Sequence, residues 1–102
     1  MKRVIQGKVY NTDTATLICE VGNGLGASDF DGWYGDLYRS PKGHYFIAGS
    51  GGARTMFGEG NGRTIWGTSG IILVDEADAQ EMASKALDGD AYIIAIGQVE
   101  EG

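Results

Sequence analysis

The stretch LYRSPKGHYFIAGSGG at residues 37–52 decides the fold, because it places a turn between two strand-forming segments. The turn, SPKG at residues 40–43, contains the only proline of the chain. Pro41 sets φ near about −65° at the second turn position, and Gly43 can adopt the positive φ that returns the chain. The flanking segments are rich in aromatic and β-branched residues, which suit a half-buried pleated surface. The stretch therefore predicts a β-hairpin with a glycine-rich exit.

Two segments before this hairpin also have strand patterns. Residues 2–10 alternate roughly, and residues 11–14 (NTDT) are typical of a turn. Residues 15–21 alternate clearly, so their odd-numbered side chains should share one apolar face, with Ile18 on the other face. We expect the two segments to pair as the first hairpin, and Cys19 to be a small buried hydrophobic residue.

The segments after the central hairpin are rich in glycine. Residues 65–66 and 71–74 predict two strands separated by a turn at residues 67–70, and the apolar run 71–74 predicts a strand covered on both faces. The glycine-rich loop at residues 58–62 lies between two arginines, but its spacing matches neither the dinucleotide fingerprint nor the P-loop. The spacing therefore does not predict a phosphate-binding loop.

A helix is predicted after the last strand. Asp75 is expected to be its N-cap, with Asp78 at near-capping-box spacing, and Gly89 is expected to end it near the C-cap. The apolar stripe of this helix comprises Ala79, Met82, Ala83, Ala86 and Leu87. Residues 90–96 could form a strand or a short helix packed back on the sheet. The expected fold class is α+β, an antiparallel meander of about five strands with one amphipathic helix (about 76–87) on one face.

Length and composition restrict the class of protein. The 102 residues, 42% of them hydrophobic, predict a single domain over residues 1–102. The single cysteine permits no internal disulfide. The N-terminus lacks the apolar run of a signal peptide, and no stretch approaches the roughly 20 apolar residues of a membrane span. We therefore expect a cytoplasmic protein with no membrane partner.

The net charge of −6 is unevenly distributed. Residues 1–74 contain seven basic and six acidic side chains, whereas residues 75–102 contain eight acidic side chains and one lysine. Direct nucleic-acid binding needs a basic surface, which this chain lacks. An acidic face can instead compete for the basic surface of a nucleic-acid-binding protein. The alternative is a solvated helix face and a soluble tail.

Candidate binding residues flank the central hairpin on both sides. The first group consists of three carboxylates with two aromatic anchors, Asp29, Asp31, Asp36, Trp33 and Tyr34. The second group belongs to the predicted helix and consists of Asp75, Glu76, Asp78 and Glu81. No catalytic residue, metal site or cofactor is predicted, because the chain has one histidine and one cysteine. The alternative enzymatic hypotheses are a Cys19–His44 dyad and an Asp29/Asp31 pair.

Several segments together resemble a largely uncharacterised family of small acidic proteins carried by phages and bacterial mobile elements. They are YNTDTA at residues 10–15, the LYR, KG and YF elements within residues 37–46, GSGG at residues 49–52, and IIL at residues 71–73 before the acidic helix. The resemblance covers most of the chain, but Val74-Asp75 and residues 92–96 depart from the family pattern. It implies no reaction. It implies a genetic setting in which small non-enzymatic proteins often inhibit host defence, anti-CRISPR proteins among them.

These observations lead to one main functional hypothesis and two alternatives. The main hypothesis is a monomer or homodimer in the host bacterial cytoplasm that binds a host defence effector, a CRISPR–Cas complex above all. Its acidic side chains would cover a basic nucleic-acid-binding surface. The first alternative is an accessory module that binds a small ligand or peptide through the glycine-rich loops. The second is a small hydrolase that uses Cys19 or the Asp29/Asp31 pair.

Overall fold

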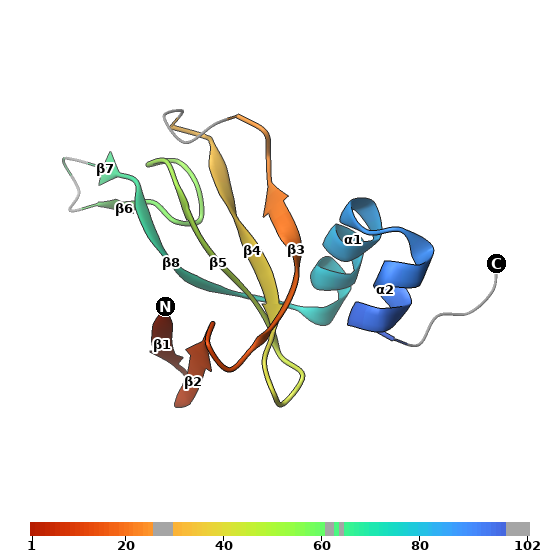
Figure 1. Cartoon of the computed structure of the whole chain (residues 1–102). Coiled ribbons are helices and arrows are strands. Elements are labelled where there is room, and N and C mark those ends of the chain that lie inside the picture. Colours follow the sequence, from red (N-terminus) through yellow and green to blue (C-terminus); the bar gives the residue numbers. More distant parts are fainter. Residues whose placement is uncertain (26–29, 61–62, 64, 98–102) are drawn as a thin grey trace.

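The computed structural model describes residues 1–25, 30–60, 63 and 65–97, and its centre is a twisted antiparallel sheet with two helices against one side (Figure 1). The sheet has the strand order β3-β4-β5-β8. Its strands are β3 (Thr16–Gly22), β4 (Trp33–Arg39), β5 (Tyr45–Gly51) and β8 (Thr68–Val74). The helices are α1 (Glu76–Ala86) and α2 (Gly89–Ala95). The predicted α+β class is confirmed, with a small β6 (Glu59–Gly60) and β7 (Ile65–Trp66) pair inserted between β5 and β8.

The central hairpin forms where the sequence predicts it. The Gly43 N–H donates to the Ser40 carbonyl at 2.9 Å, and the Ser40 N–H donates to the His44 carbonyl at 2.7 Å. Gly43 has a φ of 86°, the positive value that its lack of a side chain allows. From this turn β4 and β5 pair continuously, from Arg39 opposite Tyr45 to the far ends of both strands. This pairing fixes which side chains share a face.

The predicted pairing of residues 2–10 with residues 15–21 is wrong. Residues 2–10 instead form a hairpin of their own, in which β1 (Lys2–Ile5) pairs with β2 (Lys8–Asn11). Gln6 and Gly7 both have positive φ, 51° and 77°, the two-residue turn that matches the twist of a hairpin. The Arg3 Nη1 donates to the Ile71 carbonyl at 3.2 Å and so attaches this hairpin to β8.

The alternation predicted for β3 is interrupted by a β-bulge. The register between β3 and β4 shifts between Leu17 and Cys19. Because a bulge adds one residue on one strand, Ile18 and Cys19 are both buried in the same core, while Leu17 is 56% exposed. The prediction that Leu17 shares the buried face with Cys19 is therefore wrong, whereas the prediction of a buried Cys19 is confirmed.

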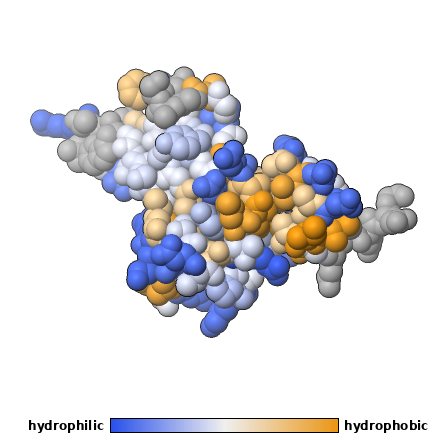
Figure 2. Space-filling view, viewed as in Figure 1, coloured by the Kyte–Doolittle hydropathy of each residue, from blue (hydrophilic) through white to orange (hydrophobic). Residues whose placement is uncertain are grey.

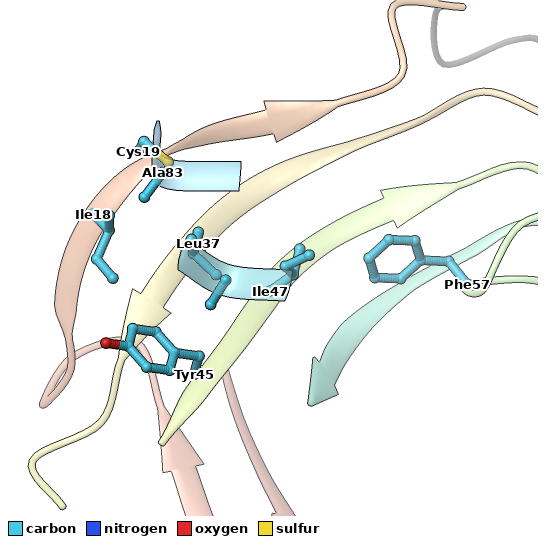
Figure 3. Packing of buried hydrophobic residues seen from close by; sticks show 8 residues of the cluster. Ile18, Cys19, Leu37, Tyr45, Ile47, Phe57 and Ala83 are labelled. Carbon is cyan, nitrogen blue, oxygen red and sulfur yellow. The ribbon is translucent and has the colours of Figure 1, made fainter. Parts of the chain in front are cut away.

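Two hydrophobic cores lie on opposite faces of the sheet. We call the larger one the helix-side core (Figure 3); its buried members are Ile18, Cys19, Leu37, Tyr45, Ile47, Phe57, Ala79 and Ala83. The hairpin-side core beneath β1 and β2 has the buried members Tyr10, Phe46 and Ile71. Ile72 and Val74 pack against the first core and Leu73 against the second, which confirms a strand covered on both faces. The turn predicted at residues 67–70 is wrong, because only Gly67 separates β7 from β8.

The helix begins as predicted and ends within one residue of its predicted end, but Gly89 does not terminate it. The Asp75 Oδ1 accepts from the Asp78 N–H at 2.9 Å, which makes Asp75 the N-cap. The helix ends at Ala86, with Leu87 as its C-cap, and Gly89 is the first residue of α2 rather than a terminator. Asp88 explains the difference, because its side chain accepts from the Ala91 N–H at 2.8 Å and starts a new helix. Residues 90–96 are therefore largely helical, packed on the helix-side core through Tyr92, Ala95 and Ile96.

Candidate partner-binding surface

Asp36 and the acidic residues of α1 lie on different sides of the sheet. Leu37 belongs to the helix-side core, so its neighbour Asp36 projects from the opposite face, since side chains alternate along a strand. Helix α1 packs on the helix-side core through Ala79 and Ala83. The acidic residues of α1 are consequently separated from Asp36 by the sheet itself.

The first acidic group is only partly a free acidic surface. Asp29 lies outside the described residues. Asp31 is exposed, and its Oδ1 lies 3.4 Å from Arg54 Nε. Both side chains are more than half exposed, so this ion pair contributes less than about 1 kcal/mol. Arg54 also lies over the Phe30 ring, 5.6 Å from its centroid. A cation of the chain itself therefore already neutralises part of the Asp31 charge.

The two predicted aromatic anchors differ in exposure. Trp33 is half-buried, packs against the helix-side core, and its ring lies 6.4 Å from the Phe57 ring. Tyr34 is 54% exposed and has the alternate orientation on β4, on the face of Asp36. Tyr34 is therefore available to a partner on that face, whereas Trp33 is chiefly part of the core.

The acidic residues of α1 have local structural roles. Asp75 caps the helix, and Glu76 and Asp78 place negative charge at the positive end of the helix dipole. The Glu76 Oε1 accepts from Gln80 Nε2 at 3.2 Å. Glu81 forms an i,i+4 ion pair with Lys85 at 3.2 Å. Helix formation alone accounts for these four residues.

The structure adds Glu20 to the candidate residues. Glu20 on β3 lies directly opposite Asp36 on β4, so the two carboxylates are cross-strand neighbours on the face away from α1. They border a hollow of about 360 Å³ in that face. We call it the acidic hollow, and the residues that matter in its lining are Glu20, Tyr34, Gly35, Asp36, Ala48 and Gly49. The absence of basic residues between Glu20 and Tyr38 was the sequence signal for an acidic surface. That signal does not predict the register of β3 on β4, which pairs Glu20 with Asp36.

Two glycines in the lining of the acidic hollow lie where β4 and β5 come close together. Gly35 of β4 lies opposite Gly49 of β5. A Cβ on Gly35 would lie 2.7 Å from the Ala48 carbonyl oxygen and 2.9 Å from the Gly49 Cα, closer than real Cβ contacts. The two glycines thus allow the strands to approach closely. Because side chains alternate along a strand, a side chain at either glycine would point to the helix-side face, where a Cβ on Gly35 would lie 3.0 Å from Ile47 Cγ2.

A second depression, which we call the groove, lies at the outer edge of β3. It has a volume of about 740 Å³ and also reaches the start of β4; its lining comprises Glu20, Val21, Gly22, Gly24, Trp33, Tyr34, Met82, Lys85 and Ala86. Figure 2 shows hydrophobic residues gathered over α1 and α2 on the face in view. The groove is mainly apolar, and its one cation, Lys85, is paired with Glu81.

The Cys19–His44 dyad gains no geometric support, and Asp29 of the alternative Asp29/Asp31 pair lies outside the described residues. Burial, and secondarily the charge of Asp36, raise the pKa of the Cys19 thiol, so the reactive thiolate is disfavoured. Cys19 faces the helix-side core, whereas the His44 ring contacts Tyr10 of the hairpin-side core at a centroid distance of 6.5 Å. The two residues of the candidate dyad thus lie on opposite faces of the sheet. Within the described ranges, no three His, Cys, Asp or Glu side chains are grouped to hold a metal ion.

The part of the chain that the structure describes contains no helix of the length and apolarity needed to cross a membrane. No protein-family model, no curated protein and no solved structure matches the chain. The resemblance to small acidic proteins of phages and mobile elements therefore stays a prediction.

Proposed function

We propose that this protein is a non-enzymatic inhibitor that binds a basic, nucleic-acid-binding surface of a partner protein. The observation that carries the proposal is the cross-strand pair of Glu20 and Asp36. Like charges directly opposite each other on a sheet destabilise it by up to about 1 kcal/mol. The pair therefore does not stabilise the folded protein. A cation bound between the two carboxylates would attract both of them and so offset their repulsion.

The surroundings of the pair suit an arginine or lysine side chain of a partner. The hollow beside the carboxylates has a volume of about 360 Å³, and Tyr34 provides an exposed aromatic ring at its border. A guanidinium group pairs with carboxylates and also stacks on aromatic rings. The net charge of −6 would additionally accelerate association with a basic surface.

The class of partner follows from the sequence resemblance. Phage and mobile-element proteins of this size and charge suggest a host defence effector, with a CRISPR–Cas complex as the first candidate, in the cytoplasm of the host bacterium. Such effectors hold nucleic acid in positively charged channels. A protein that occupies the channel through its carboxylates would prevent the nucleic acid from binding there.

The experiment is a binding assay of this protein against purified defence effectors, in competition with their nucleic acid. We expect the Glu20→Lys/Asp36→Lys variant to lose binding. The matched control is Asp13→Lys/Glu59→Lys, which changes the net charge equally at two exposed residues outside the acidic hollow. Binding by the wild type that is equally tight in the first variant, or no binding to any effector, would refute the proposal.

A further inference from the structure

The outer edge of β3 borders the groove with backbone groups that point away from the sheet. Among the described residues, no strand pairs with β3 on the side away from β4. The Asn23 N–H donates to the Trp33 carbonyl at 3.3 Å. Because bonded and non-bonded pairs alternate in an antiparallel ladder, Val21 bonds to β4, whereas Glu20 and Gly22 direct their N–H and C=O groups outward.

The groove places this edge opposite an apolar helix wall. Glu20 and Gly22 of β3 face Met82 and Ala86 of α1 across it. Grooves between an edge strand and a helix accept extended peptides, which add a strand to the sheet and insert alternate side chains into the apolar space. The volume of about 740 Å³ is ample for several side chains.

The two faces at this edge demand different side chains from an added strand. Side chains of an added strand that lie on the side of α1 would meet Val21, Met82 and Ala86. The alternate side chains would lie on the opposite face beside Glu20, with Asp36 one strand further into the sheet. The first set must be apolar and the second set basic, because each face then meets complementary groups.

We propose that the outer edge of β3 binds, by strand addition, an extended segment of a partner protein in which basic and apolar residues alternate. This inference rests on the proposed function, because it uses the same Glu20–Asp36 pair and specifies the form of the partner. A second copy of this chain is the poorer occupant. Its net charge of −6 opposes association with an edge that carries Glu20.

The test uses the full chain and two synthetic peptides of the same composition, about eight residues long. One peptide alternates arginine and valine, and the other has all its arginines before all its valines. We expect the alternating peptide to bind about tenfold more tightly than the block peptide. We also expect hydrogen exchange of the Glu20 and Gly22 amides to slow at least about tenfold in its complex.

Two variants with matched controls localise the binding. Ala86→Trp fills the groove from an exposed position, and Ala77→Trp places the same side chain on an exposed position of α1 outside the groove. Glu20→Lys reverses a charge at the edge, and Asp13→Lys reverses one in a distant exposed turn. We expect the first variant of each pair to weaken binding of the alternating peptide about tenfold and the second to leave it unchanged.

The outcomes separate this inference from the proposed function. Equal binding of the two peptides, or unchanged exchange at Glu20 and Gly22, would overturn strand addition and leave the charge-based function intact. A dimer that sedimentation detects and that Ala86→Trp dissociates would assign the edge to a second copy, and would also overturn the inference. Effector binding that tolerates reversal of both Glu20 and Asp36 would remove the function itself.

Discussion

Glu20 of β3 and Asp36 of β4 are direct cross-strand neighbours, and both side chains project from the face of the sheet opposite α1. The β4–β5 hairpin holds Asp36 in place, and the pairing of β3 with β4 places Glu20 beside it. Among the described residues, no ion pair with a basic side chain is found for either carboxylate. The pair therefore has measurable consequences in the free protein.

Removing one charge of the pair should stabilise the free protein. We expect Asp36→Asn to raise the free energy of unfolding by about 0.5 kcal/mol at low salt, because it ends the cross-strand repulsion. The gain should shrink at high ionic strength, since salt screens exposed charges. Urea denaturation at two salt concentrations measures both effects. Asp13→Asn, in an exposed turn, is the control with the same loss of charge; an equal gain there would show that the effect comes from net charge alone.

The bulge in β3 predicts opposite effects of substitution at two adjacent residues. Ile18 is 7% exposed and belongs to the helix-side core, whereas Leu17 is 56% exposed. We expect Ile18→Ala to lower the free energy of unfolding by about 3 kcal/mol, because it creates a cavity in the core. Leu17→Ala should cost less than about 1 kcal/mol. The reverse order in chemical denaturation would mean that β3 alternates without a bulge.

The N-caps of the two helices should differ in importance. Asp75→Ala removes the acceptor of the Asp78 N–H and should cost about 1 kcal/mol of stability, because α1 covers the helix-side core with Ala79 and Ala83. Asp88→Ala removes the equivalent bond of α2, which has no buried residue. Thermal unfolding should therefore detect the first substitution clearly and the second much less. Equal losses would indicate that α2 is as important to the fold as α1.

The buried thiol makes stability fall at alkaline pH. Burial raises the pKa of Cys19 in the folded protein, and the charge of Asp36 adds to this. The folded state then retains the proton that the unfolded chain releases above about pH 8.5. Its contribution to stability is complete below that pH and is lost as pH rises through the folded pKa. We expect urea denaturation between pH 8 and 10 to show a shallower decline for Cys19→Ala than for the wild type, and identical slopes would contradict this.

Local chemistry was sufficient to predict several elements. The turn at residues 40–43, the Asp75 cap and the doubly covered strand at residues 71–74 each depend on a few adjacent residues with strong preferences. The error at the N-terminus arose because a two-residue turn needs only Gln6 and Gly7 with positive φ, and glutamine gives no signal for it. The bulge was likewise invisible, because it depends on how β3 pairs with β4 rather than on residues 15–21 alone.

The candidate surface was predicted only in part, for a related reason. Asp36 and Tyr34 were identified by composition, and the structure places both at the acidic hollow. Glu20 was missed because residues 23–32 separate β3 from β4, and a loop of that length does not fix the register. Conversely, the acidic residues of α1 were predicted to bind a partner because of their number. Helix capping and the i,i+4 ion pair within the helix explain them instead.

Strand β5 contributes side chains to both cores, and this determines how the protein should unfold. Tyr45 and Ile47 belong to one core and Phe46 to the other, and β5 pairs with both β4 and β8. Loss of this strand would dismantle both cores together, so the sheet should unfold as one cooperative unit. The β1–β2 hairpin is anchored through Tyr10 and Arg3 at the margin, and it should open more often than the sheet beneath it.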